Sequence, residues 1–196
     1  MELSENPLEV AFPMLTPADK EALINAFDSF SVISKDFYMG GYSNEALQGD
    51  GWPSFFISIY KSESVKNTKG IVLSNTCDIS PENQRDMPKN LVFAPIVKLS
   101  EYEIWLKKSG INVNSISDKI GAIKEQRVSN IFYLPENNQL GGEYIALFDR
   151  LSHMPASEIK TMLGQVKLFT LSQFGFYYFL FKISHHFCRL PEGLHR

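Results

Sequence analysis

Residues 70–80 place the strongest constraint on the fold of this 196-residue chain. They read Gly-Ile-Val-Leu-Ser-Asn-Thr-Cys-Asp-Ile-Ser, so a short apolar run passes directly into polar residues. A β-branched run of this length is typical of a buried strand. We therefore expect a strand that leaves the sheet after residue 73 and presents Ser74, Asn75, Cys77 and Asp78 at its end, where functional groups are often found.

Further apolar runs bounded by turn residues predict the other strands of a β-core. They cover residues 54–60, 90–97, 128–134, 144–148 and 166–171. The segments 36–53, 61–69, 81–88 and 149–157 are expected to be turns and loops. Pro95 lies inside one of the runs, and it predicts an edge strand or a bulge because proline cannot donate to a β-ladder.

Helical spacing of apolar residues predicts helices before, within and after the strands. The first starts at Thr16, whose hydroxyl can cap the first turn, and extends to Phe30. A helical insert at residues 100–128 holds two short helices. One covers residues 103–108 and ends at Gly110, and the other opens at Ser115. The last helix follows Ser172 and carries one apolar stripe: Phe176, Phe179, Leu180, Ile183 and Phe187.

These elements predict an α+β fold in one domain that spans residues 1–196. Its β-sheet should be small, antiparallel and strongly bent, or a partly open SH3-like barrel. We expect residues 1–53 to pack as a helix and loops on a β-core at residues 54–171. An aromatic helix at residues 172–190 would complete the domain.

The charge of the chain restricts its partners. A net charge of −3 gives no general attraction to nucleic acid, so RNA binding would need a local basic patch. Lysines at positions 61, 66, 69, 107 and 108 could form one, although solvated surface lysines are the simpler interpretation. RNA therefore stays a possible partner rather than an expected one.

Cysteine content and hydropathy predict a soluble, cytoplasmic protein. The two cysteines, Cys77 and Cys188, lie far apart, and the N-terminus lacks the pattern of a secretory signal, so we expect free thiols in a reducing compartment. The longest apolar run, residues 174–181, is too short to span a membrane. We expect no membrane contact, and we expect the aromatic C-terminal helix to belong either to the core or to an interface with a protein partner or a second copy.

Two strand sequences and their order resemble the MazF/PemK growth-inhibitor family. They are Ile-Val-Leu-Ser-Asn at residues 71–75 and Leu-Val-Phe-Ala-Pro-Ile-Val at residues 91–97, followed by a helical insert, a strand and a terminal helix. The resemblance implies an SH3-like barrel, commonly dimeric, of a kind that often serves as the ribonuclease of a toxin–antitoxin pair. The polar block also resembles microbial proteins with a T/S-x-T/S-C-D-I/L strand end, a likeness that implies no function.

Two positions depart from the MazF/PemK pattern. Val97 stands where the family carries a hydroxyl, and Thr68-Lys69 stands where it carries Arg-Pro. Because the family uses those positions to cleave RNA, the resemblance implies binding more strongly than cleavage here.

Three residues are candidates for catalysis: Cys77, Asp78 and His153. A thiol becomes a useful nucleophile when a nearby base or cation lowers its pKa, and His153 could provide that base. In the alternative interpretation, Cys77 fills a buried space, Asp78 caps a turn and His153 is a surface residue. Asp149 and Arg150 could form a structural ion pair.

No metal or other cofactor is expected. His185 and His186 are adjacent on a helix and point to different sides, and the chain has no C-x-x-C or H-E-x-x-H motif. The residues that we expect to contact a nucleic acid or protein partner are Lys69, Ser74, Asn75, Phe176 and Phe179.

Three functions remain open at this point. The first is a component of a microbial conflict system, of the toxin–antitoxin or phage-defence type, that binds a protein or nucleic-acid partner. The second is a hydrolase or transferase that uses Cys77 with His153. The third is a non-catalytic subunit whose aromatic helix forms an interface.

Overall fold

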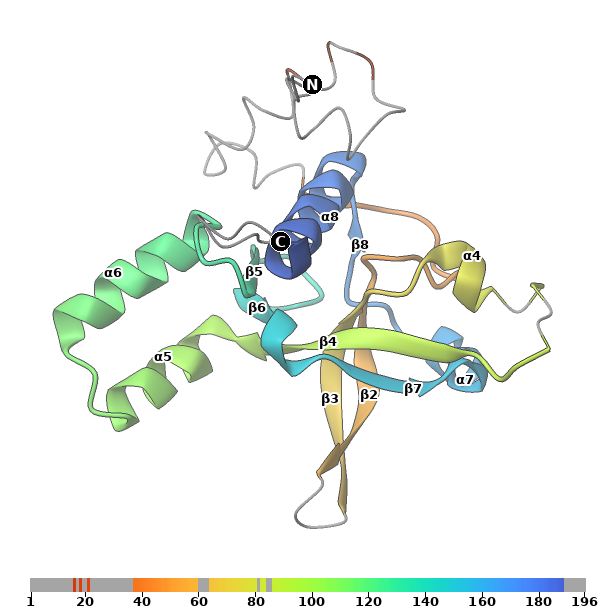
Figure 1. The fold of residues 1–196 in the computed structure, drawn as a ribbon, viewed down its shortest axis with the longest axis horizontal. Helices are drawn as coiled ribbons and strands as arrows, with labels where there is room; N and C mark the ends of the chain where they lie inside the picture. The colour runs from red at the N-terminus through yellow and green to blue at the C-terminus, as the bar shows by residue number, and fades with distance from the viewer. Residues whose placement is uncertain are drawn as a thin grey trace, which may run out of the picture.

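The computed structural model of the chain describes residues 37–59, 64–80 and 86–188, together with Thr16, Ala18, Glu21, Glu82 and Asn83. The fold is α+β, with helices packed around mostly antiparallel strands (Figure 1). The helix predicted from Thr16 to Phe30 lies outside the described residues, apart from Thr16, Ala18 and Glu21.

Strand β4 (Asn90–Lys98) is the centre of the main sheet, whose order is β2-β3-β4-β6-β5. It pairs along one edge with β3 (Ser64–Val72), which in turn pairs with β2 (Gly51–Ile59). Along the other edge its first half pairs with β7 (Ser152–Pro155) and its second half with β6 (Tyr144–Leu147), which pairs with β5 (Ile131–Leu134). The path of the described strands runs from β2 to β5 and does not close into a ring.

The position of Pro95 corrects the sequence-based expectation of an edge strand or bulge. It lies inside the central strand, opposite Gly70 of β3. On the other edge it stands between Phe93, the last residue paired with β7, and Ile96, the first residue paired with β6. The ladder is interrupted there, so a proline without an N–H group is tolerated.

Several expected connections are in fact strands. Residues 149–157 were expected to be a loop, but they contain a 3₁₀ turn, η2 (Phe148–Arg150), strand β7 and the start of a second turn, η3 (Ala156–Glu158). Strand β3 begins at Ser64 within the expected hairpin connection, and β2 begins at Gly51 within the expected loop. Strand β8 (Thr170–Leu171) is short and pairs with β1 (Tyr38–Met39) in a separate two-stranded sheet.

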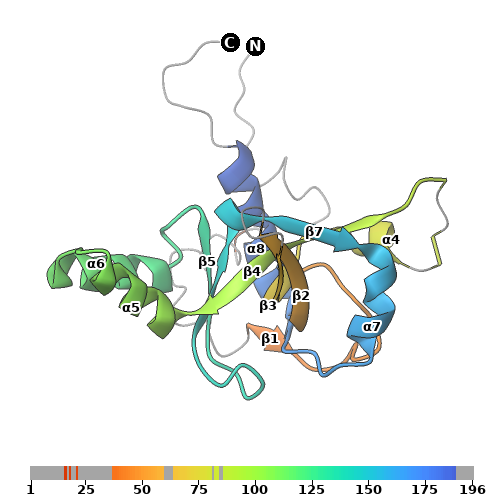
Figure 2. The same ribbon diagram turned by 90° about the horizontal axis from the view of Figure 1, so that it is seen from below.

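The helices lie on different sides of the sheet. The helical insert forms α5 (Leu99–Lys108) and α6 (Val113–Lys124), which project together from one end, with α4 (Thr76–Ile79) and α7 (Ile159–Leu163) at the other (Figures 1 and 2). Helix α8 (Gln173–Cys188) was predicted correctly. Among the helices described, none combines the length and apolar character that crossing a membrane requires.

Alternate residues of β4 supply two hydrophobic clusters. Ala94 and Ile96 belong to the larger cluster, which includes Phe132, Phe148 and Phe179 and so anchors α8. Leu91 and Phe93 belong to a smaller cluster that contains Trp52, Phe55 and two residues of α7: Ile159 and Met162. Because successive side chains of a strand point to opposite faces, β4 connects the two clusters.

Candidate functional site

The polar block at the end of β3 forms a cap and a short helix rather than an assembled catalytic site. Asn75 is the N-cap of α4, and its side-chain oxygen accepts a hydrogen bond from the backbone N–H of Cys77 at 2.9 Å. Ser74 Oγ accepts from the backbone N–H of Val92 at 2.8 Å and extends the pairing of β3 with β4. Both side chains thus stabilise the point where the chain leaves the sheet.

Cys77 is exposed, so the interpretation of this residue as a buried space-filler is wrong. Its thiol makes no hydrogen bond with a described residue, and Asp78 next to it is also exposed. His153 lies on β7 opposite Val92 and not in a loop. Within the described part of the chain, no hydrogen bond or ring contact joins His153 to Cys77.

The expected partner-binding residues have different environments. Lys69 donates a hydrogen bond to the hydroxyl of Tyr144 at 2.7 Å. Phe179 is fully buried and packs against Phe132, with ring centroids 5.4 Å apart, so it is a core residue. Phe176 is half-buried on the same helix. The structure therefore does not bring the residues expected from sequence together in one site.

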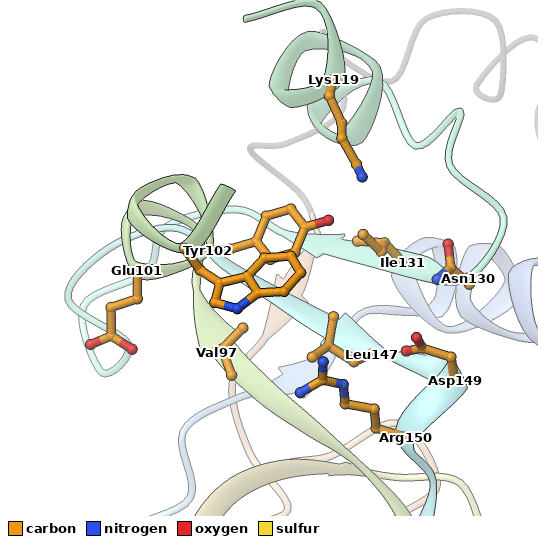
Figure 3. Close-up of a pocket in the computed structure, with 10 residues that line it drawn as sticks. Val97, Glu101, Tyr102, Lys119, Asn130, Ile131, Leu147, Asp149 and Arg150 are labelled. Atoms are coloured by element: carbon orange, nitrogen blue, oxygen red, sulfur yellow. The ribbon is translucent and has the colours of Figure 1, made fainter. Parts of the chain in front are cut away.

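A cavity of about 380 Å³ lies instead between the helical insert and the face of the sheet formed by β4, β5 and β6 (Figure 3). Its apolar floor is one side chain from each of those strands: Val97, Ile131 and Leu147. Ile131 pairs directly with Leu147, which places both side chains on the same face of the sheet. The rest of the lining is polar or aromatic: Glu101, Tyr102, Trp105, Lys119, Asn130, Asp149 and Arg150.

Tyr102 and Trp105 form the aromatic wall of this cavity. They are one helical turn apart on α5, and their rings stack with centroids 6.0 Å apart and an interplanar angle of 24°. Trp105 is 53% exposed, a large value for an aromatic ring next to a cavity. Lys119 of α6 places its Nζ 5.7 Å from the centroid of the Tyr102 ring. The wall is therefore aromatic, exposed at Trp105 and close to a cation.

Asn130, Asp149 and Arg150 line the cavity across from the aromatic wall (Figure 3). Their side chains make no hydrogen bond or ion pair with another described residue, so the expected ion pair between Asp149 and Arg150 does not form. Asp149 and Arg150 are exposed, since they lie on the turn η2 between β6 and β7. The cavity thus offers a free carboxylate, a free amide and a free guanidinium to a ligand.

Neither protein-family models nor curated proteins give a match to this chain. The candidate site therefore depends on its own geometry. Within the described residues, no three His, Cys, Asp or Glu side chains gather where they could hold a metal ion. The cavity residues instead suit an organic ligand with a flat ring and polar edges, because the aromatic wall offers stacking and the opposite side offers hydrogen bonds.

The sequence held only partial signals for this site. Tyr102 and Trp105 have the i, i+3 spacing of neighbours on a helix face, and a tryptophan on a short polar helix is the sequence signal for this site. Asp149 and Arg150 were noted as a pair with each other. Nothing in the sequence points to Asn130 or Lys119, which reach the cavity only through the fold.

Proposed function

We propose that this chain binds single-stranded RNA, with one base stacked in the cavity next to Tyr102 and Trp105. The observation that carries the proposal is the exposed, stacked aromatic wall opposite unpaired polar side chains. Proteins that bind single strands use this combination, because every base has a flat face that can stack and polar edges that can be bonded.

The charges of the cavity also fit a nucleic-acid strand. Lys119 and Arg150 bring two cations to the lining of the cavity, while the whole chain has a net charge of −3. The lining also holds two carboxylates, so these two side chains are its sources of attraction to phosphate. Attraction to the phosphates would then be local, and binding should depend on salt only weakly. With two phosphate contacts on a single strand, the slope of log K against log salt should be roughly −1.4.

We place this activity in a microbial conflict system of the toxin–antitoxin or phage-defence type, built on a partly open SH3-like barrel. The support for this context is the MazF/PemK resemblance, together with the two partner strands along one edge of β4, which suit a strongly bent sheet. A protein partner or a second copy of the chain is part of this proposal, since the family is commonly dimeric.

RNA cleavage is not part of the proposal. Val97 lines the cavity but has no hydroxyl. Lys69 donates a hydrogen bond to the hydroxyl of Tyr144. Tyr144 and Leu147 are an odd number of residues apart on β6, so their side chains lie on opposite faces of the strand, and Leu147 is the one that lines the cavity. The two positions that the family uses for cleavage therefore do not meet at the cavity.

The cysteine-dependent alternative keeps one supporting observation, the exposure of Cys77, but no described base contacts the thiol.

The test is the affinity for a fluorescently labelled single-stranded RNA of about ten nucleotides, measured by anisotropy. Trp105→Ala should weaken binding by about ten-fold, because stacking on one aromatic ring contributes about 1–3 kcal/mol per base. Trp105→Phe should retain most of the affinity. Ile104→Ala is the matched control, since Ile104 is 50% exposed on the same helix and does not line the cavity.

Two outcomes would contradict the proposal. One is equal binding by the wild type and Trp105→Ala. The other is equal affinity for a perfect RNA duplex, whose bases are already stacked and cannot enter the cavity.

A further inference from the structure

We propose that the cavity selects guanine over the other three bases, with the Asp149 carboxylate accepting hydrogen bonds from the guanine N1–H and N2–H groups. This inference rests on the RNA binding proposed above and names the base that the same site takes. It starts from Asp149, a carboxylate on the side of the cavity opposite the aromatic wall (Figure 3).

Asp149 is free to bind a ligand. It is exposed on η2, and its side chain makes no hydrogen bond or ion pair with a described residue. A base that stacks on the aromatic wall has a face against the rings and directs its edges sideways, parallel to the ring planes. Asn130 and Asp149 lie together to one side of the Tyr102 ring, just before β5 and just after β6 (Figure 3). The edge of the base therefore meets a carboxylate and an amide.

The chemistry of a carboxylate then restricts the base. An ionised carboxylate only accepts hydrogen bonds, and its two oxygens suit two neighbouring donors. On its Watson–Crick edge guanine alone presents two adjacent donor groups, N1–H and N2–H₂. Adenine and cytosine present one amino group beside a ring nitrogen whose lone pair would face the carboxylate. Uracil presents one N–H between two carbonyl oxygens, which a carboxylate repels.

The neighbouring side chains complement the remaining atoms of guanine. The amide of Asn130 can donate to the O6 carbonyl, because an asparagine side chain offers two donors and one acceptor. Arg150 offers a guanidinium that can bond to O6, to N7 or to a phosphate of the strand. Glu101 also lines the cavity, but its carboxylate points away from the rings and does not compete for the base (Figure 3).

The test uses uridine oligomers of about eight nucleotides with one central guanosine, adenosine, cytidine or inosine. We expect the guanosine oligomer to bind about ten-fold more tightly than the adenosine oligomer. Inosine, which lacks the N2 amino group, should lose several-fold in affinity relative to guanosine. Asp149→Asn should abolish the preference for guanosine, because the amide replaces the carboxylate that accepts from N1–H and N2–H.

Asp118→Asn is the matched control. Asp118 is exposed on α6 and does not line the cavity, so its replacement removes one carboxylate from the helical insert without removing the proposed contact. This variant should keep the full guanosine preference. Equal thermal unfolding midpoints of the two variants would show that the loss of guanosine preference in Asp149→Asn does not come from unfolding.

The outcomes separate this inference from RNA binding itself. If all four oligomers bind equally and Trp105→Ala still weakens them, guanine selection is wrong and RNA binding stands. If no oligomer binds but GMP binds more tightly than AMP, guanine selection stands and the ligand is a free nucleotide rather than RNA. If neither the oligomers nor the nucleotides bind, both proposals are wrong.

Discussion

At the scale of single residues, Lys182 is the most unusual group in the core. It lies on α8, is 3% exposed, and donates hydrogen bonds to the backbone carbonyls of Gln126 at 2.8 Å and Val128 at 2.6 Å. Gln126 in turn bonds through its side chain to the backbone of Tyr133 on β5. Lys182 thus ties the last helix to the connection between α6 and β5, beside the strands that form the floor of the cavity.

Burial lowers the pKa of Lys182 to about 8, from 10.5 in the unfolded chain. Between these two values the unfolded chain binds more protons than the native protein, so this residue makes the free energy of unfolding rise with pH. We expect the stability of the wild type relative to Lys182→Met to increase by about 2 kcal/mol from pH 8 to pH 10.

Urea denaturation of the two proteins at pH 7, 8.5 and 10 measures this difference. The buried tyrosines, whose pKa values burial raises, titrate in both proteins and cancel in the comparison. If the difference in the free energy of unfolding between the two proteins stays constant across this pH range, the lowered pKa of Lys182 is contradicted.

Most of the site could not be predicted from sequence, for physical reasons that differ between residues. The polar end of β3 was predicted, but Ser74 and Asn75 satisfy backbone groups there, and no local pattern distinguishes a cap from a binding residue. Asp149 and Arg150 were recognised as charged neighbours. Whether they pair depends on the turn η2, which is set by the strands on either side of it.

At the scale of elements, the prediction was most accurate where one element carries a long apolar pattern. Strand β4 and helix α8 were both predicted to within a residue or two, because their buried side chains follow the period of a strand and of a helix. Strand β7 was missed because it has only four residues and ends at Pro155. This segment forms a strand because it pairs with β4, and that pairing depends on the tertiary fold rather than on the local sequence.

The start of α6 was placed three residues too late. Ser115 was expected to open the helix, but Asn112 is the N-cap, and its side-chain oxygen accepts a hydrogen bond from the N–H of Asn114 at 2.9 Å. Likewise, α5 was expected to begin at residue 103 but begins at Leu99. Both errors concern the boundaries of helices that the sequence did predict.

We expect Asn112→Ala to destabilise α6 by about 1 kcal/mol, since it leaves a first-turn N–H without its acceptor. Amide hydrogen exchange in the first turn of α6 should then accelerate by about five-fold. Asn114→Ala is the control, because Asn114 takes part in the cap through its backbone only. Equal acceleration in both variants would contradict the role of the Asn112 side chain.

At the scale of the whole molecule, the two hydrophobic clusters share strands β3 and β4. Ile71 of β3 belongs to the larger cluster, and Val72, the next residue, belongs to the smaller one. Gly70 packs against the smaller cluster: a Cβ atom there would lie 2.7 Å from the Phe55 ring and 3.0 Å from the Phe93 ring, both members of it. Two clusters built on the same strands should not unfold independently, because losing either one exposes the same backbone.

The two tryptophans allow a direct test of this coupling. Trp52 is fully buried in the smaller cluster, and Trp105 lines the cavity. In Trp105→Phe, the fluorescence of Trp52 reports the smaller cluster, while far-UV circular dichroism reports mainly α8, α6 and α5, on the side of the larger one. We expect the two signals to give the same urea midpoint and the same slope, as in a two-state transition. A fluorescence change at lower urea would instead mean that β2 and α7 detach first, and that the larger cluster holds the floor of the cavity without them.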